Sequence, residues 1–327
     1  MAINITIIGL GKIGASIGLG LQEHKEKILR SGHDPEPTRA KKMEKEGAID
    51  RVFYNLPESV RDADVVILAL PVGEVEETLK YIAEDLRQGV VVIDTSPVHA
   101  GVIEWAKKNL PAERHFISIY PVVNPLYLEE YSTDADKPHA NLFEKSDFLV
   151  AAESNTHPDA LQLVEDLASL LKANIYISDP KEADGISARV ELLPRLLAAG
   201  LINTTIEKAG WQDIRRSTGK SFAGITGVIE QLKGDERPGA AFILNKQNTL
   251  DGIDQIVKSL QELRSLINDS EESVLNKLLK NARNSHSKWL EQRTTGDWEK
   301  YIGEKPPSTK ERLGGLFGIR ERKKKTL

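Results

Sequence analysis

The chain contains no cysteine, which excludes disulfide bonds, thiolate nucleophiles and cysteine-ligated zinc. It also has no excess of basic residues, because 44 lysines and arginines face 49 acidic residues for a net charge of -5. A general nucleic-acid binder is usually basic, so no nucleic-acid partner is expected. The absence of cysteine also agrees with a reducing, intracellular compartment.

Long hydrophobic runs are absent as well. The longest apolar stretches, such as VVILALPV at 65–72, are far shorter than a membrane span, so no membrane partner is expected. The N-terminal MAINITIIGLG has no basic segment before its strand-like pattern, which argues against a signal peptide. These features predict a cytoplasmic globular protein, and 327 residues are enough for two domains.

The first half of the chain alternates short β-branched runs with helical stretches. Seven runs have the composition of strands: 4–9, 28–33, 64–70, 90–94, 115–119, 147–152 and 174–178. Continuous apolar runs such as Val65–Leu70 are typical of strands covered on both faces, as in a parallel sheet. The alternation predicts an α/β fold, an N-terminal Rossmann doubly wound parallel sheet over residues 1–178.

After residue 178 the strand patterns stop and an all-helical C-terminal domain is predicted over 179–292. Asp179 can cap a helix, Pro180 suits its first position and Glu182 can complete a capping box. Two apolar stripes at helical spacing follow: Ile253, Ile256, Val257, Leu260, Leu263 and Ile267, then Val274, Leu275, Leu278, Leu279 and Ala282. Residues 293–327 end in a block of basic residues and are predicted to be a disordered tail.

The segment IIGLGKIGASIG carries Gly9, Gly11 and Gly14 in G-x-G-x-x-G spacing between a strand and a helical stretch. In that context the pattern predicts a dinucleotide site with the pyrophosphate at a helix N-terminus. Asp34 follows the second strand, where a carboxylate binds the adenosine ribose and repels a 2′-phosphate. NAD is therefore favoured, and Arg39 keeps NADP possible.

Two later strands end in polar or turn-forming residues that should reach the same edge of the sheet. Pro71 and Val72 close the strand at 64–70, where the second half of the cofactor crosses. VIDTSPVHA brings Thr95, Ser96 and His99 to a strand-to-helix junction. Thr95 or Ser96 can equally be a helix cap, and a solvated helix-start position is favoured for His99 over a catalytic one.

These motifs together resemble the prephenate/arogenate dehydrogenase family of tyrosine biosynthesis. The resemblance rests on the glycine motif, ADVVILALPVGEVEETL, VIDTSPVHA, DPKEADGISARVELLPRLLAAGL and GWQDIRRSTG, and it extends from residue 3 to about 292. It implies a Rossmann domain, a helical dimerisation domain and a homodimer. The implied reaction is hydride transfer from a cyclohexadienyl ring to nicotinamide with loss of carbon dioxide, driven by aromatisation.

The chain departs from the family pattern in its substrate half. The family histidine after the strand at 115–119 falls on Tyr120, and a His-Asp pair falls on Ala183 and Asp184. The family Ser-His-Leu-Pro-His becomes residues 191–195, which read ELLPR, while the arginine of Arg-Asp-x-Thr-Arg is kept as Arg216. An unperturbed tyrosine is a poor base near neutral pH, so Tyr120 needs a nearby cation such as Arg195 or Lys246 to lower its pKa.

The candidate catalytic residues are therefore Tyr120, Ser96 and Lys246, and the candidate ligands of a small anionic substrate are Arg195, Arg215, Arg216 and Asn124. The predicted cofactor contacts are Gly9, Leu10, Gly11, Lys12, Ile13, Gly14, Asp34, Leu70, Pro71, Val72 and Thr95. No metal site is predicted, and Asp134, Asp136 and His139 are assigned to an exposed connection. Two alternatives stay open: a dehydrogenase of another small carboxylic acid that uses Tyr120 or Lys246, and a non-catalytic nicotinamide-binding regulator.

Overall fold

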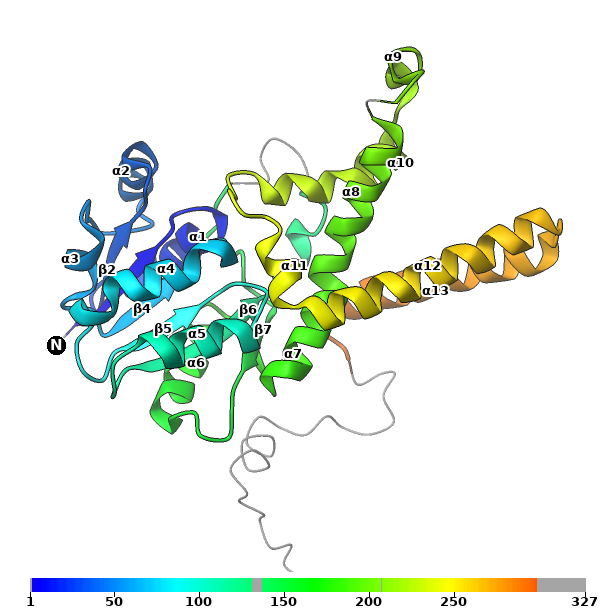
Figure 1. Cartoon of the computed structure of the whole chain (residues 1–327). Coiled ribbons are helices and arrows are strands. Elements are labelled where there is room, and N and C mark those ends of the chain that lie inside the picture. Colours follow the sequence, from blue (N-terminus) through cyan, green and yellow to red (C-terminus); the bar gives the residue numbers. More distant parts are fainter. Residues whose placement is uncertain (1, 131–136, 207, 299–327) are drawn as a thin grey trace, which may run out of the picture.

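One eight-stranded sheet runs through the N-terminal half of the computed structural model, which describes residues 2–130, 137–206 and 208–298 (Figure 1). Its order is β3-β2-β1-β4-β5-β6-β7-β8. The order reverses between β1 and β4, and such a switch point opens a crevice at the carboxyl ends of the strands. The strands are β1 (Ile3–Ile8), β2 (Ile28–His33), β3 (Arg51–Val52), β4 (Val65–Leu68), β5 (Val91–Asp94), β6 (His115–Pro121), β7 (Asp147–Ala151) and β8 (Asn174–Ser178).

Strands β1 to β6 are parallel, whereas β7 pairs antiparallel with β6 and parallel with β8. A parallel pair needs a long crossover, usually a helix. The described part of the β6–β7 connection holds only the short η3 (Pro125–Tyr127) and turns, so the chain turns back beside β6. The expected alternation of strands is confirmed, with the two-residue β3 added and the last two strands reversed.

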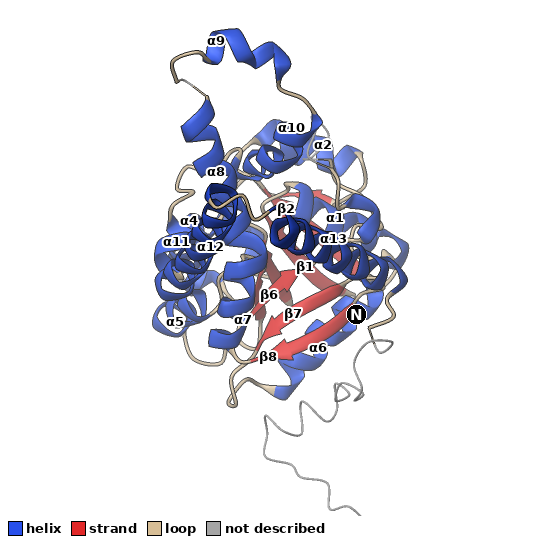
Figure 2. Ribbon diagram, turned by 90° about the vertical axis from the view of Figure 1, so that its right-hand side faces the viewer, coloured by secondary structure: helices blue, strands red, loops and turns tan. Residues whose placement is uncertain are grey.

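Helices pack on both faces of the sheet (Figure 2). One apolar cluster includes Ile7, Ile17 and Val164, and a second includes Val66, Val75 and Val102. Central residues such as Ile67 and Ile93 have no exposed surface, which explains the continuous apolar runs of their strands. The elements are α1 (Lys12–Gly20), η1 (Gln22–His24), α2 (Pro37–Lys45), α3 (Leu56–Val60), α4 (Val72–Ile82), η2 (Ala83–Asp85), α5 (Ala100–Asn109) and α6 (Pro158–Leu170).

The second half is helical and begins as its sequence predicts. The Asp179 carboxylate accepts a hydrogen bond from the Lys181 amide, and Pro180 is the first helical residue. Glu182 does not close a capping box, because its carboxylate accepts from the Ser178 hydroxyl. The elements are α7 (Pro180–Ser187), the π turn η4 (Ala188–Leu192), α8 (Leu193–Thr205), α9 (Trp211–Ile214), η5 (Arg215–Ser217), α10 (Lys220–Thr226), η6 (Gly227–Leu232), α11 (Ala240–Leu244), α12 (Lys246–Asn268) and α13 (Glu272–Thr295).

Helices α12 and α13 form a long hairpin that projects from the body (Figure 1). The predicted apolar stripes lie on these helices, and the described residues cover them only in part: Leu260 is 56% exposed and Ile267 is 65% exposed. Neighbouring exposed apolar side chains are typical of a protein–protein contact. The predicted tail at 293–327 lies largely outside the described residues, and α13 continues to Thr295.

Candidate functional site

Gly9 and Gly14 are required by the packing of the chain itself. Gly9 has φ +89°, and a Cβ there would lie 2.4 Å from the Ala69 carbonyl oxygen. A Cβ at Gly14 would lie 2.0 Å from the Gly9 carbonyl oxygen. These two glycines therefore bring helix α1 against strands β1 and β4, as the motif predicts.

Gly11 has a different role. It is the N-cap of α1 with φ −71°, a conformation that any residue can adopt, and a Cβ there would meet no atom within 4 Å. Neither backbone geometry nor packing explains a glycine at this position. A ligand that approaches the backbone at a helix N-terminus does explain it, and anions bind at such termini.

A cavity of about 810 Å³ opens above this loop at the switch point. It contains seven of the predicted cofactor contacts: Gly9, Leu10, Gly11, Lys12, Asp34, Leu70 and Pro71. Four others do not line it: Ile13 packs against the core, Gly14 and Val72 are buried, and the Thr95 hydroxyl donates to the Leu68 carbonyl at 3.1 Å. The size and position of the cavity suit a dinucleotide.

Asp34 is held rigidly beside the glycine loop. Its Oδ2 accepts from the Leu10 amide at 2.8 Å, and its Oδ1 accepts from the Glu36 amide at 2.9 Å. Arg39 forms an ion pair with Oδ1 at 3.2 Å and lines the cavity together with Lys42. The carboxylate favoured for NAD and the cations that could meet a 2′-phosphate thus occur side by side.

A buried polar cluster lies below the carboxyl ends of β5 and β6. The predicted catalytic Ser96 is 2% exposed, and its hydroxyl donates to Asp94 Oδ2 at 2.5 Å. Burial raises the pKa of Asp94 to about 7. The Ser96 hydroxyl is therefore engaged with an internal carboxyl group, and its catalytic role stays a prediction.

The solvated position expected for His99 is wrong, because the residue has no exposed surface. The start of α5 packs against α7, so the His99 ring contacts the Ser118 hydroxyl at 2.8 Å and the Ser187 hydroxyl at 3.3 Å. Asp184 accepts from the His99 amide at 2.6 Å and from the Ala100 amide at 3.2 Å. Burial lowers the pKa of His99 to about 4, so the ring is neutral near pH 7.

Tyr120, at the end of β6, meets the helical half. Its hydroxyl donates to Glu191 Oε2 at 2.5 Å, and Arg195 pairs with the other oxygen of the same carboxylate. Arg195 also donates to Gln231 Oε1 at 3.2 and 3.3 Å. The segment after Gln231 reaches the large cavity, which Lys233 and Gly234 line.

The surroundings of Tyr120 act on its pKa opposite to the expected direction. Burial and the negative charge of Glu191 raise the pKa of Tyr120 well above its ordinary value near 10, and Arg195 opposes this only in part. The expected neighbour Arg195 is therefore present, but Glu191 stands between it and the phenol. A phenolate at Tyr120 is therefore disfavoured near neutral pH.

The remaining predicted site residues lie elsewhere. Asn124 is 4% exposed, and its side chain accepts from the Leu126 amide and donates to the Asn141 carbonyl. Lys246 is exposed at the first position of α12. Arg215 and Arg216 are exposed in η5, which directly follows α9 at the far end of the segment that carries α8 and α10 (Figure 1). Their proposed roles stay predictions, since the structure does not bring them to Tyr120.

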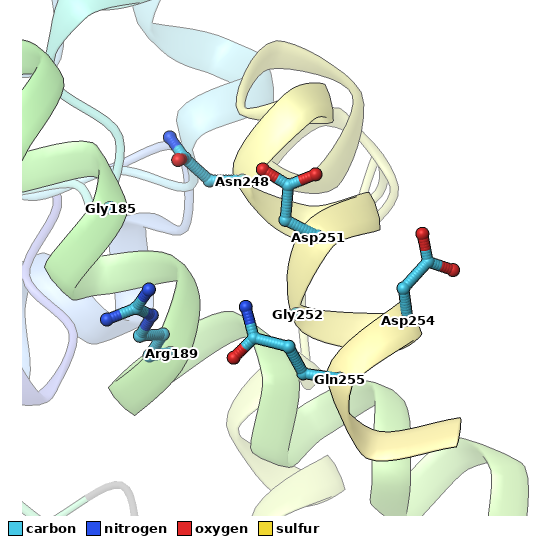
Figure 3. A pocket seen from close by; sticks show the side chains of 7 residues that line it. All are labelled: Gly185, Arg189, Asn248, Asp251, Gly252, Asp254 and Gln255. Carbon is cyan, nitrogen blue, oxygen red and sulfur yellow. The ribbon is translucent and has the colours of Figure 1, made fainter. Parts of the chain in front are cut away.

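A separate cavity of about 230 Å³ lies between α7 and α12 (Figure 3). Arg189 lines it opposite Gln255. Within the described residues no cluster of three potential metal ligands is present. Asp134 and Asp136 fall outside those residues, while His139 stacks on Tyr127 with ring centroids 4.2 Å apart.

Sequence reasoning did not single out Glu191, Gln231, Ser118 or Ser187. One signal could have identified Glu191: it lies four residues before Arg195, the spacing of an ion pair on one helical face. Pro194 is a second signal, because it has no N–H to form a helical hydrogen bond with the Val190 carbonyl. The π turn η4 lies directly before it. Such turns are frequent at functional sites.

The glycine loop at the switch point, the acidic residue after β2 and a polar cluster beside a helical domain define a two-domain, nucleotide-dependent dehydrogenase. Residues 17–177 match the family model described as prephenate dehydrogenase, nucleotide-binding domain, and residues 179–281 match that described as prephenate dehydrogenase, dimerization domain. The chain belongs to the prephenate dehydrogenase family.

Individual relatives agree with this assignment. Prephenate dehydrogenase of Lactococcus lactis subsp. cremoris (strain MG1363) is 28% identical over 263 residues, which cover 79% of this chain and 70% of the relative. Cyclohexadienyl dehydrogenase of Zymomonas mobilis subsp. mobilis is 26% identical over 267 residues, covering 81% and 88%. The crystal structure of prephenate dehydrogenase from A. aeolicus in complex with hydroxyphenyl propionate and NAD+ has a TM-score of 0.75 at 22% identity, covering 88% of this chain and 98% of that chain.

None of the helices in the described ranges combines the length and the apolar content needed to cross a bilayer.

Proposed function

We propose that the chain catalyses the NAD-dependent oxidative decarboxylation of a cyclohexadienyl acid, prephenate or arogenate, in tyrosine biosynthesis. One observation carries the proposal beyond family membership: the nucleotide-sized cavity and the Tyr120–Glu191 contact lie along the same edge of the sheet. Hydride transfer needs a proton acceptor for the substrate hydroxyl next to the cofactor. The names of the relatives, prephenate and cyclohexadienyl dehydrogenase, support this substrate class.

The cofactor that fits best is NAD. Gly11 leaves room for the pyrophosphate, and the buried Asp34 carboxylate suits ribose hydroxyls. When bound, the nicotinamide supplies the hydride acceptor. NADP is the second candidate, because Arg39 and Lys42 line the same cavity and can meet a 2′-phosphate.

The proposed working unit is a cytoplasmic homodimer with three segments: a cofactor domain at 1–178, a helical domain at 179–292 and a basic tail at 293–327. The exposed stripes of α12 and α13 support pairing through the helical domain. We assign the anionic substrate to Arg195, with Arg215, Arg216 and Asn124 as further candidates.

The test is NADH formation by purified protein with saturating NAD, offered prephenate and arogenate in separate assays. Turnover on one acid supports the proposed reaction and identifies the substrate. A folded protein that binds NAD in calorimetry but oxidises neither acid would refute it. That result would favour a different small carboxylic acid or a binding-only role.

A further inference from the structure

We infer that Glu191 is the terminal proton acceptor of this site and acts through the hydroxyl of Tyr120. The inference rests on the proposed function and assigns the step for which the family histidine is missing. It starts from one contact, the 2.5 Å hydrogen bond that Tyr120 donates to Glu191 Oε2. A phenol that donates its own proton keeps its oxygen lone pairs for an incoming donor. The ring hydroxyl of a cyclohexadienyl acid is such a donor.

Other polar side chains at the carboxyl ends of β5 and β6 have hydrogen-bond partners of their own. The His99 ring contacts Ser118 and Ser187 and has no exposed surface. Ser96 is buried against Asp94. Among the described residues, Glu191 is the side chain that forms a hydrogen bond with the Tyr120 hydroxyl.

The carboxylate is held so that one oxygen serves Tyr120. Arg195 pairs with Oε1, which leaves Oε2 to the phenol, and Gln231 in turn accepts from Arg195. Both charged side chains are largely buried, Glu191 at 16% and Arg195 at 15% exposure. A carboxylate fixed in this way needs little reorganisation when it receives a proton.

The reaction releases no net proton, so the residues that accept the proton of the ring hydroxyl can later return it. As the ring hydroxyl gives its proton to the Tyr120 oxygen, Tyr120 gives its own proton to Glu191. The C–H bond on the same ring carbon breaks, and its electron pair leaves as hydride to the nicotinamide. The C–C bond to the ring carboxylate then breaks, carbon dioxide leaves, and the electron pair passes through the ring to the oxygen. That oxygen takes the proton back through Tyr120, so no proton is gained or lost overall.

The raised pKa of Tyr120 fits this role, since burial and the neighbouring carboxylate oppose a lasting phenolate while the hydrogen bond permits transfer. Tyr120 and Glu191 therefore form one unit, and removal of either interrupts the same path. Residues that act as a unit have strongly non-additive effects on rate.

The first test is a double-mutant cycle with Tyr120→Phe, Glu191→Gln and the double variant, using the acid that wild type oxidises. Each single variant should lower kcat by about 10²- to 10⁴-fold, the usual share of general acid–base catalysis, and the double variant should be no slower than the slower single. Formate should restore part of the rate to Glu191→Ala. Glu230→Gln, which removes an exposed carboxylate next to Gln231, serves as the matched control and should keep the wild-type rate. Full rate in Glu191→Gln, or effects that multiply in the double variant, would overturn the inference.

A second readout does not depend on turnover. Calorimetry of NAD-loaded protein should show at least tenfold tighter binding of hydroxyphenyl propionate than of phenylpropionate, because the phenol can hydrogen bond with the Tyr120–Glu191 unit. Tyr120→Phe and Glu191→Gln should both lose most of that preference. Lack of preference in wild type would refute the inference even if the protein oxidised neither acid, whereas an intact preference without turnover would refute the proposed reaction alone.

Discussion

Replacement of Gly11 by alanine should separate nucleotide binding from folding. The added Cβ meets no atom of the described residues within 4 Å, and the backbone at φ −71° accepts an L-residue without strain. Gly11 is the N-cap of α1, where alanine is less favourable than glycine, so we expect a loss of at most about 1 kcal/mol in the free energy of unfolding.

The effect on nucleotide binding should be larger. The methyl group occupies the space in which a pyrophosphate approaches the loop amides, and one hydrogen bond to a charged group contributes about 1.5–3 kcal/mol. Loss of one such bond raises the Kd by roughly 10- to 150-fold, since each 1.4 kcal/mol is a factor of ten. Gly11→Val, with two more carbon atoms, should bind NAD more weakly still.

The measurements are calorimetric NAD binding and urea unfolding of the free protein. Gly200→Ala is the control, because Gly200 also has open space at its Cβ position but lies in α8, away from the cavity. It should bind NAD as wild type does and gain up to about 1 kcal/mol of stability. Wild-type affinity in Gly11→Ala would contradict the placement of the pyrophosphate, and a large loss of stability would show that Gly11 is needed for packing.

Three further outcomes are expected. Asp34→Asn should raise the ratio of kcat/KM for NADP to that for NAD at least tenfold in steady-state assays, because it removes the charge that repels a 2′-phosphate; an unchanged ratio would exclude Asp34 from cofactor choice. Leu260→Glu should dissociate the proposed homodimer in light scattering, while Ser259→Glu on the same helix should not, and a dimeric Leu260 variant would contradict the proposed interface. The pKa of His99 is lowered from 6.5 to about 4, so its contribution to stability is lost as the pH falls across that range. The pKa of Asp94 is raised from 3.8 to about 7, so its contribution to stability is lost as the pH rises across that range. The two contributions to the free energy of unfolding nearly cancel between pH 6.5 and 4. His99→Gln should therefore gain up to about 3 kcal/mol of stability relative to wild type as the pH falls from 6.5 to 4. If urea unfolding shows the same pH dependence of stability in the variant and in wild type, this balance is disproved.

The cofactor half could be predicted from the sequence because its determinants are local. A strand, a glycine turn and a helix are adjacent in the chain, and Asp34 follows the next strand directly. What the pattern could not separate is the role of each glycine. Gly9 and Gly14 are fixed by contacts with the backbone, while Gly11 is open, and only coordinates distinguish the two.

The substrate half could not be predicted in the same way because its contacts join distant segments. Tyr120 and Glu191 are 71 positions apart, and no local pattern pairs them. The resemblance identified the positions at which the family histidines are replaced but not what the replacements do together. Arg195 or Lys246 was the cation expected to lower the pKa of Tyr120, and the structure places the Glu191 carboxylate between Tyr120 and Arg195.

The buried polar cluster below the site explains how the segments that carry Tyr120 and Glu191 are held in place relative to each other. The Asp184 carboxylate accepts from two amides at the start of α5, and its backbone carbonyl accepts from the Asn245 side chain, so α7 is joined to the starts of both α5 and α12. Ser187 contacts His99 one turn later, and Glu191 follows after another four residues, within the π turn. Asp184 and Ser187 therefore connect α7 to its neighbours, and Glu191 follows them along the chain with its carboxylate at the Tyr120 hydroxyl. The proposed role of Glu191 thus depends on the buried cluster, because a proton acceptor on the helical domain can serve Tyr120 only if that domain is held firmly against the edge of the sheet.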